Sequence, residues 1–76
     1  MGLQILDTVV LERDLPEHSL KRGDLGVVVE LYEPDGVEVE FVSGPGKTLA
    51  LVTLTRPDVR LVGETDVLAA RRLSPA

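Results

Sequence analysis

The pattern of hydrophobic and polar positions along the chain predicts a small antiparallel β-structure. Three runs are rich in valine and leucine and are bounded by Gly, Pro and Asp residues; they span 25–32, 37–42 and 48–54. This length and composition are typical of strands rather than helices. Two shorter runs, 8–11 and 59–62, are expected to add edge or closing strands.

A tight turn is predicted at residues 33–36, where the sequence Glu-Pro-Asp-Gly separates the first two long runs. A type I turn closed by a glycine bulge pairs Glu33 with Val37 and places Leu31 opposite Val39. A two-residue loop would instead set glutamates opposite the apolar positions. We therefore expect the bulged register.

The next hairpin is expected to close through the five-residue loop 43–47. Pairing Val42 with Thr48 aligns Phe41 with Leu49, which continues the apolar face across the third strand. The core positions expected on the three long strands are Val29, Leu31, Val39, Phe41, Leu49 and Leu51.

The order of the segments favours an all-β, SH3-like barrel over residues 1–62. Residues 13–22 lack a clear period and contain Pro16, which predicts a long irregular loop after the first strand. Residues 63–76 form a separate tail. There, Thr65 or Asp66 could cap a short helix; the alternative is a frayed end.

Composition narrows the function classes. The chain has 76 residues, a net charge of −5 and no cysteine, which excludes disulfide and thiolate chemistry. It has no apolar run of the roughly 20 residues that a membrane helix needs, and no basic-then-apolar leader pattern. We expect a cytoplasmic chain, and its small size favours a protein partner or a homo-oligomer.

Motifs that suggest chemistry are weak. The Gly-Lys-Thr at 46–48 resembles the end of a phosphate-binding loop, but Phe41 stands where the leading glycine belongs and a strand follows instead of a helix. The single histidine, His18, has no evident catalytic or metal-binding companions. Asp24, in a Gly-Asp turn, is expected to bond its own backbone. We therefore predict no catalytic residues, no cofactor, no metal and no enzymatic activity.

The outward face of the predicted sheet is the candidate binding surface. In the bulged register Glu30 lies opposite Glu40, and Glu38 lies beside Tyr32, which gives an apolar patch with an acidic border. Strand bending, or cover by the tail, could instead hide part of this face. The predicted partner-binding residues are Val28, Glu30, Tyr32, Glu38, Glu40, Val42 and Val52. Their charge favours a basic protein as partner.

The segment 21–30, Lys-Arg-Gly-Asp-Leu-Gly-Val-Val-Val-Glu, resembles the KOW-type strand-turn of SH3-like barrels in ribosomal and transcription proteins. Together with segments 6–11, 14–18, 37–41 and 49–54, it makes the chain similar to a family of small bacterial domains of unknown function, over about residues 5–62. This resemblance implies the fold and no established activity.

Two functions follow as hypotheses. The first is a non-enzymatic protein-interaction module, for example an inhibitor or immunity-like partner of a basic protein. The alternative is a KOW-type RNA- or DNA-binding barrel that acts through Lys21, Arg22, Lys47 and Arg56. The negative net charge and the presence of only two aromatic residues disfavour nucleic acid as a ligand.

Overall fold

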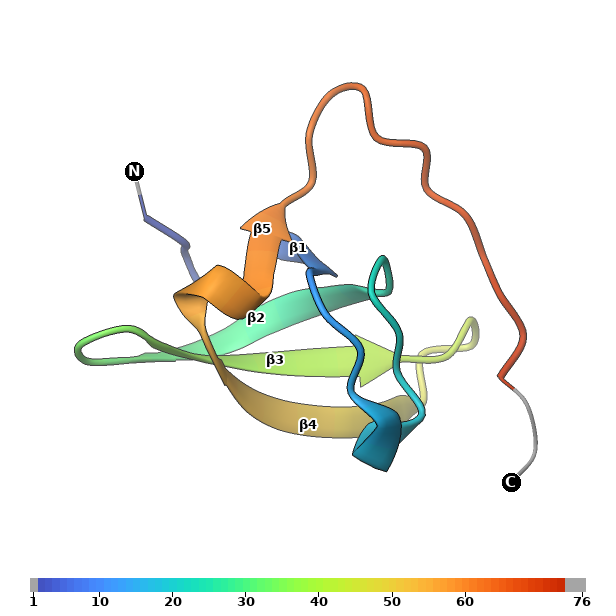
Figure 1. The fold of residues 1–76 in the computed structure, drawn as a ribbon, viewed down its shortest axis with the longest axis horizontal. Helices are drawn as coiled ribbons and strands as arrows, with labels where there is room; N and C mark the ends of the chain where they lie inside the picture. The colour runs from blue at the N-terminus through green and yellow to red at the C-terminus, as the bar shows by residue number, and fades with distance from the viewer. Residues whose placement is uncertain (1, 74–76) are drawn as a thin grey trace.

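Five antiparallel strands form one curved sheet in the computed structural model, which describes residues 2–73 (Figure 1). The strands are β1 (Thr8–Leu11), β2 (Leu25–Tyr32), β3 (Gly36–Val42), β4 (Thr48–Thr55) and β5 (Val59–Leu61). They pair in the order β4-β3-β2-β1-β5. The expected all-β fold of about five strands is confirmed, and the SH3-like assignment within that class stays a prediction.

Short 3-10 turns join some of the strands. Turn η1 (Pro16–His18) lies in the long loop after β1, and turn η2 (Arg56–Asp58) links β4 to β5. Among residues 2–73 no α-helix is present, and none therefore exists that could cross a membrane.

The core lies on the concave side of the sheet and is almost entirely aliphatic. Its buried side chains come from all five strands and from the loop after β1; they are Val9, Leu11, Leu15, Leu20, Val28, Val37, Val39, Phe41, Val52, Leu54 and Val59. Gly26 allows strands β2 and β3 to approach closely, because a Cβ at this position would lie 2.4 Å from Cγ1 of Val39. The same Cβ would lie 3.0 Å from Cε1 of Phe41, so the ring of the single phenylalanine packs directly against the Gly26 backbone.

The hairpin between β2 and β3 is shifted by one residue on each strand from the predicted register. Tyr32 pairs with Gly36 and Leu31 with Val37, so the three-residue loop consists of residues 33–35 instead of 34–36, and the Glu33–Pro34 peptide bond in it is cis. The predicted pairing of Glu33 with Val37 was therefore wrong.

A bulge is present in this hairpin, but it lies inside β2 and not at the turn. The register shifts between Val28 and Glu30, so that Val28 pairs with Val39 while Glu30 pairs with Glu38. The extra residue, Val29, reverses the alternation of side chains along β2. Val28 is consequently buried in the core, and its predicted outward position was wrong.

The hairpin between β3 and β4 starts as predicted, with Val42 paired with Thr48. One extra residue then follows in β4, so that Phe41 pairs with Ala50 instead of Leu49. Since strand side chains alternate with period two, every later β4 side chain changes faces.

This reversal decides which β4 residues reach the core. Val52 is 8% exposed and Leu54 is buried, whereas Leu49 is half exposed and Leu51 is 56% exposed. The outward position predicted for Val52 was therefore wrong, as were the core positions predicted for the two leucines.

The irregular segment 13–22 contributes more to the core than the sequence suggested. Leu15 and Leu20 are buried and pair with each other in an isolated antiparallel bridge, with η1 between them. The segment thus folds into a small closed loop that seals one end of the sheet.

The tail contains no helix in its described part, residues 63–73; the rest of the predicted 63–76 segment lies outside the described residues. It leaves β5, turns after Gly63, and runs back along the molecule without regular secondary structure (Figure 1). The carboxylate of Asp66 accepts hydrogen bonds from the Gly63 N–H, at 2.5 Å, and from Arg60. The side-chain turn at Asp66 thus takes the place of the helix cap considered for this residue.

Candidate protein-interaction face

Three glutamates gather on the convex face of the sheet. Glu38 and Glu40 alternate along β3 with buried valines, and Glu30 of β2 lies directly opposite Glu38. Antiparallel partners share a face, so all three carboxylates point away from the core. We call Glu30, Glu38 and Glu40 the acidic face. The predicted pairing of Glu30 with Glu40 was wrong, because Glu40 pairs with Val27.

Exposed apolar side chains border the acidic face. Leu51 of β4 pairs with Glu40 and is 56% exposed. Val42 follows Glu40 on the same side of β3 and is 43% exposed, and Tyr32, at the end of β2, is 45% exposed. Apolar and aromatic groups beside carboxylates are a combination found where proteins bind partners.

Two of the glutamates are held in place by hydroxyl donors. The Tyr32 hydroxyl donates a short hydrogen bond to Oε1 of Glu38. The Thr48 Oγ1 hydroxyl donates to Oε2 of Glu40 at 2.5 Å. The hydrogen bond to Glu38 raises the pKa of Tyr32, as do partial desolvation of the phenol and the charges of Glu38 and Glu30. The Tyr32 phenol therefore stays protonated and serves as a fixed donor.

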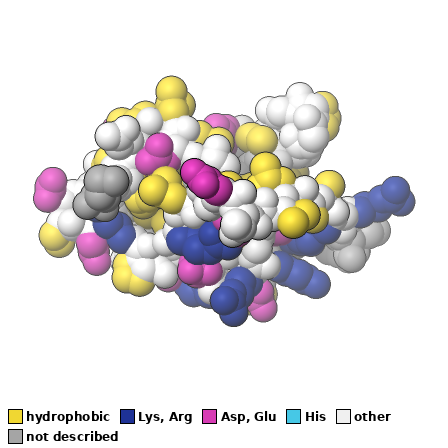
Figure 2. All heavy atoms as spheres, turned by 90° about the horizontal axis from the view of Figure 1, so that it is seen from above, with side chains coloured by type: hydrophobic (Ala, Val, Ile, Leu, Met, Phe, Trp, Pro, Cys, Tyr) yellow, Lys and Arg dark blue, Asp and Glu magenta, His cyan; other side chains and the backbone are white. Residues whose placement is uncertain are grey.

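Four of the eight cationic side chains form ion pairs away from the acidic face. All four are arginines, and the pairs are Arg13–Asp58, Arg22–Glu12, Arg60–Glu12, Arg60–Asp66 and Arg71–Asp24. On the face of the molecule seen in Figure 2, Lys and Arg side chains accordingly lie next to Asp and Glu side chains. Within residues 2–73, no glutamate of the acidic face takes part in an ion pair. The negative charge of this face is therefore not compensated by the described part of the chain.

The structure brings together five of the seven predicted partner-binding residues. These are Glu30, Tyr32, Glu38, Glu40 and Val42. Val28 and Val52 belong to the core instead. Sequence reasoning missed Leu51, which lies on this face because of the bulge at the start of β4, and Thr48, which precedes the bulge and donates to Glu40. Both alternating sets of positions in β4 contain apolar residues, so the sequence did not indicate which set faces the core or that a bulge is present.

The other residues considered from the sequence have structural surroundings. Asp24 accepts a hydrogen bond from the Lys21 N–H at 2.9 Å, which confirms its predicted backbone bond. His18 ends η1 on the surface, and loop 43–47 joins two strands, as expected. Within the described residues, no group of three or more His, Cys, Asp or Glu side chains could hold a metal ion.

The basic residues considered for nucleic-acid binding are divided between the two ends of the sheet. Lys21 and Arg22 precede β2, at the end where Lys47 precedes β4. Arg56 lies at the opposite end, where its N–H donates to the Asp35 carbonyl. Arg22 also pairs with Glu12. These four residues do not form one basic surface.

Comparison with known protein families identifies one family that matches this chain. A family model described as a domain of unknown function (DUF4926) matches residues 5–61. No curated protein and no solved structure matches the chain. The matched range contains all five strands and the acidic face, and it ends before the tail. The resemblance to a small family of unknown function is therefore confirmed.

Proposed function

The chain belongs to the family of the domain of unknown function DUF4926, and we propose that it works as a non-enzymatic module that binds a basic protein through its acidic face. A small inhibitor or an immunity-like protein, which neutralises a basic partner such as a nuclease, is the specific form that this proposal takes. The observation that carries it is the set of uncompensated carboxylates Glu30, Glu38 and Glu40 on one exposed face.

The direct opposition of Glu30 and Glu38 supports a cationic partner. Like charges across a strand pair destabilise the sheet by a few tenths of a kcal/mol or more, on the order of the pair energies in sheets. A lysine or arginine placed between the two carboxylates would turn this repulsion into attraction. A cationic partner would therefore gain binding energy by relieving the repulsion between Glu30 and Glu38.

The apolar border supports a protein rather than a small cation as the ligand. Tyr32, Val42 and Leu51 each expose two-fifths or more of their surface beside the carboxylates. Their burial would add a hydrophobic contribution of roughly 25 cal/mol per Å², while the carboxylates speed association and select partners by charge. Tyrosine is also a frequent anchor residue in interfaces.

The test compares two triple variants of the full chain as baits for proteins of the native host. One variant carries Glu30→Gln, Glu38→Gln and Glu40→Gln. The matched control carries Glu17→Gln, Glu33→Gln and Glu64→Gln, which removes the same charge from exposed positions elsewhere. We expect a basic protein to be captured by the wild type and by the control, and lost with the acidic-face variant.

The captured protein is then purified and titrated against all three chains. Removal of the acidic face should raise the Kd by about 10-fold or more, which corresponds to at least about 1.4 kcal/mol. Affinity for the wild type should fall as salt is raised from 0.05 to 0.5 M, amounts chosen to span the screening range. A partner with the same affinity for both triple variants would refute the proposed face.

Nucleic-acid binding is an alternative outcome of the same experiments. A generic oligonucleotide titrated at low salt should give no signal with the wild-type chain, because the candidate basic residues are split between two ends of a negatively charged molecule. Tight, salt-dependent binding that is lost with Lys21→Ala and Lys47→Ala would instead support the KOW-type alternative.

A further inference from the structure

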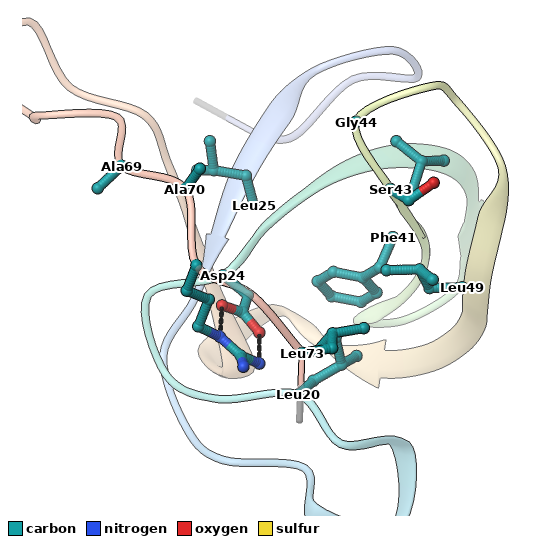
Figure 3. A pocket seen from close by; sticks show the side chains of 12 residues that line it. Leu20, Asp24, Leu25, Phe41, Ser43, Gly44, Leu49, Ala69, Ala70 and Leu73 are labelled. Atoms are coloured by element: carbon teal, nitrogen blue, oxygen red, sulfur yellow. Dashed lines mark hydrogen bonds and ion pairs between the residues drawn. The ribbon is translucent and has the colours of Figure 1, made fainter. Parts of the chain in front are cut away.

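A second surface lies at the end of the sheet where β2 begins, beneath the tail. A groove of about 410 Å³ is bordered there by Leu73 of the tail and, at this end of the sheet, by Leu20, Leu25, Phe41, Val42 and Leu49. Figure 3 shows Leu73 beside Leu20, with the Phe41 ring and Leu49 facing the same space. The groove is apolar along its floor, and one carboxylate, Asp24, stands at its rim.

The rim holds acceptors for three N–H donors of a guanidinium group. Arg71 donates from Nε to Oδ1 of Asp24 at 2.8 Å and from an NH2 nitrogen to Oδ2 at 2.6 Å. The same nitrogen donates to the Ser19 carbonyl at 3.0 Å. Asp24 is fixed in this position by the Lys21 N–H, and its side chain is only 17% exposed. Bidentate contact with a fixed carboxylate is the geometry that distinguishes arginine from lysine.

The tail occupies this site with few other attachments. After Asp66, the hydrogen bonds from the described tail to the rest of the chain all come from the Arg71 side chain. Val67 is 89% exposed and Leu68 is also largely exposed. Two open volumes remain beside Arg71, the groove above and one of about 510 Å³ bordered by Asp14, Pro16 and Lys21. The tail therefore contacts the groove through Arg71 but leaves part of its volume open.

The two halves of this contact differ in their relation to the family. Residues Ser19, Asp24 and Phe41, which form the site, lie inside the matched range 5–61, whereas the tail that supplies Arg71 lies beyond it. The residues that form the groove thus belong to the family domain, whereas the tail that lies over it is outside the matched range.

We propose that the groove is a recognition site for an extended protein segment that carries an arginine two residues before a leucine, and that the chain's own tail is a competing occupant. Asp24 and the Ser19 carbonyl bind the arginine, and the apolar floor at Leu20 and Phe41 binds the leucine. This site adjoins the border of the acidic face at Val42, which lines the groove, but it contains none of the three glutamates.

The tail competes with a separate segment for the groove because it is covalently connected to the same chain. A short flexible connection gives the tail an effective concentration on the order of millimolar at the groove. If the tail fills the groove about nine-tenths of the time, a segment in trans binds about tenfold more weakly than to an empty groove. Loss of the tail contacts should therefore strengthen binding in trans.

The test uses the full chain and a labelled peptide with the sequence of residues 67–73, blocked at both ends. One variant of the chain empties the groove by Arg71→Ala and Leu73→Ala. The matched control carries Arg72→Ala and Leu68→Ala, which removes the same residue types from exposed tail positions. The peptide should bind the emptied chain about tenfold more tightly than the wild type or the control.

Two further measurements locate the binding. A peptide with alanine in place of Arg71 should lose binding to the emptied chain, whereas alanine in place of Arg72 should leave it. The amide signals of Leu20, Asp24 and Phe41 should shift in NMR spectra when the peptide binds. No binding to the emptied chain, equal binding to all three chains, or shifts confined to Tyr32 and Glu38 would overturn this proposal; only the last would leave peptide binding to the acidic face.

Discussion

At the scale of single residues, Glu38 shows how one side chain takes part in both structure and binding. It lies opposite Glu30, and it accepts the hydrogen bond of the Tyr32 hydroxyl. The phenol offsets part of the repulsion between the two carboxylates, because it donates a hydrogen bond to one of them. A partner that binds here meets carboxylates whose orientation is already fixed.

This local arrangement predicts a shifted titration of the single tyrosine. The hydrogen bond to Glu38 and the nearby negative charges should hold the pKa of Tyr32 above the ordinary value of about 10. Ultraviolet absorbance follows this titration without interference, since the chain has one tyrosine and no tryptophan. In the Glu38→Gln variant the pKa should fall toward 10.

The control for this measurement is Glu33→Gln, which removes a charge from the neighbouring loop residue and should leave the titration midpoint in place. A wild-type midpoint at about 10, or one that does not respond to Glu38→Gln, would contradict the hydrogen bond between Tyr32 and Glu38.

At the scale of elements, the strand positions could be predicted from the sequence and their faces could not. Two of the five strands, β1 and β2, have the predicted bounds, and the others differ by one residue at an end. The bulges in β2 and β4 each add a single residue that carries no special sequence, since valine and leucine fit either face of a strand. One added residue reverses the faces of all side chains on the far side of the bulge from the turn that sets the register, which explains why Val28 and Val52 were misplaced.

The register of β4 predicts a reversed sensitivity at two adjacent residues. Val52→Asn should destabilise the fold by about 2–4 kcal/mol, because it removes buried apolar surface and buries an amide. Leu51→Asn should change the unfolding free energy by less than about 1 kcal/mol, since Leu51 is 56% exposed. Urea unfolding of both variants measures the difference.

The register expected from the sequence makes the opposite prediction, with Leu51 in the core and Val52 outside. The two variants therefore act as controls for each other. A larger loss for Leu51→Asn than for Val52→Asn would show that the bulge at the start of β4 is absent in solution.

At the scale of the whole molecule, carboxylates at the junctions hold separate segments together. Asp58 in η2 accepts hydrogen bonds from the Thr55 N–H and hydroxyl and from Arg13, which ties the β4–β5 link to the loop after β1. Asp24 accepts from Arg71 of the tail, and Asp66 of the tail accepts from Arg60 of β5. The Arg13–Asp58 and Arg71–Asp24 pairs could not be predicted from the sequence, because each depends on how segments more than 40 residues apart meet in space.

These junctions make stability depend on acid pH. Burial raises the pKa of Asp58 and of Asp24, but their hydrogen bonds to backbone N–H groups and arginines outweigh it and leave each pKa below its usual value. The Arg60 guanidinium and the Gly63 N–H lower the pKa of Asp66 to about 2. Each of these carboxylates contributes its full stabilisation at pH values above its unfolded-state pKa of about 3.9. That stabilisation is lost as the pH falls through the lower pKa of the folded state.

The urea midpoint of the wild type should therefore stay nearly constant from pH 7 to about 5 and fall steeply between about 4 and 2. Asp58→Asn should cost about 1–2 kcal/mol at pH 7, since charge-assisted hydrogen bonds are lost, and its midpoint should depend less on pH below 4. Glu64→Gln, at an exposed tail position, should leave the midpoint at pH 7 unchanged. A wild-type midpoint that stays level or rises down to pH 3 would show that these carboxylates do not stabilise the folded chain.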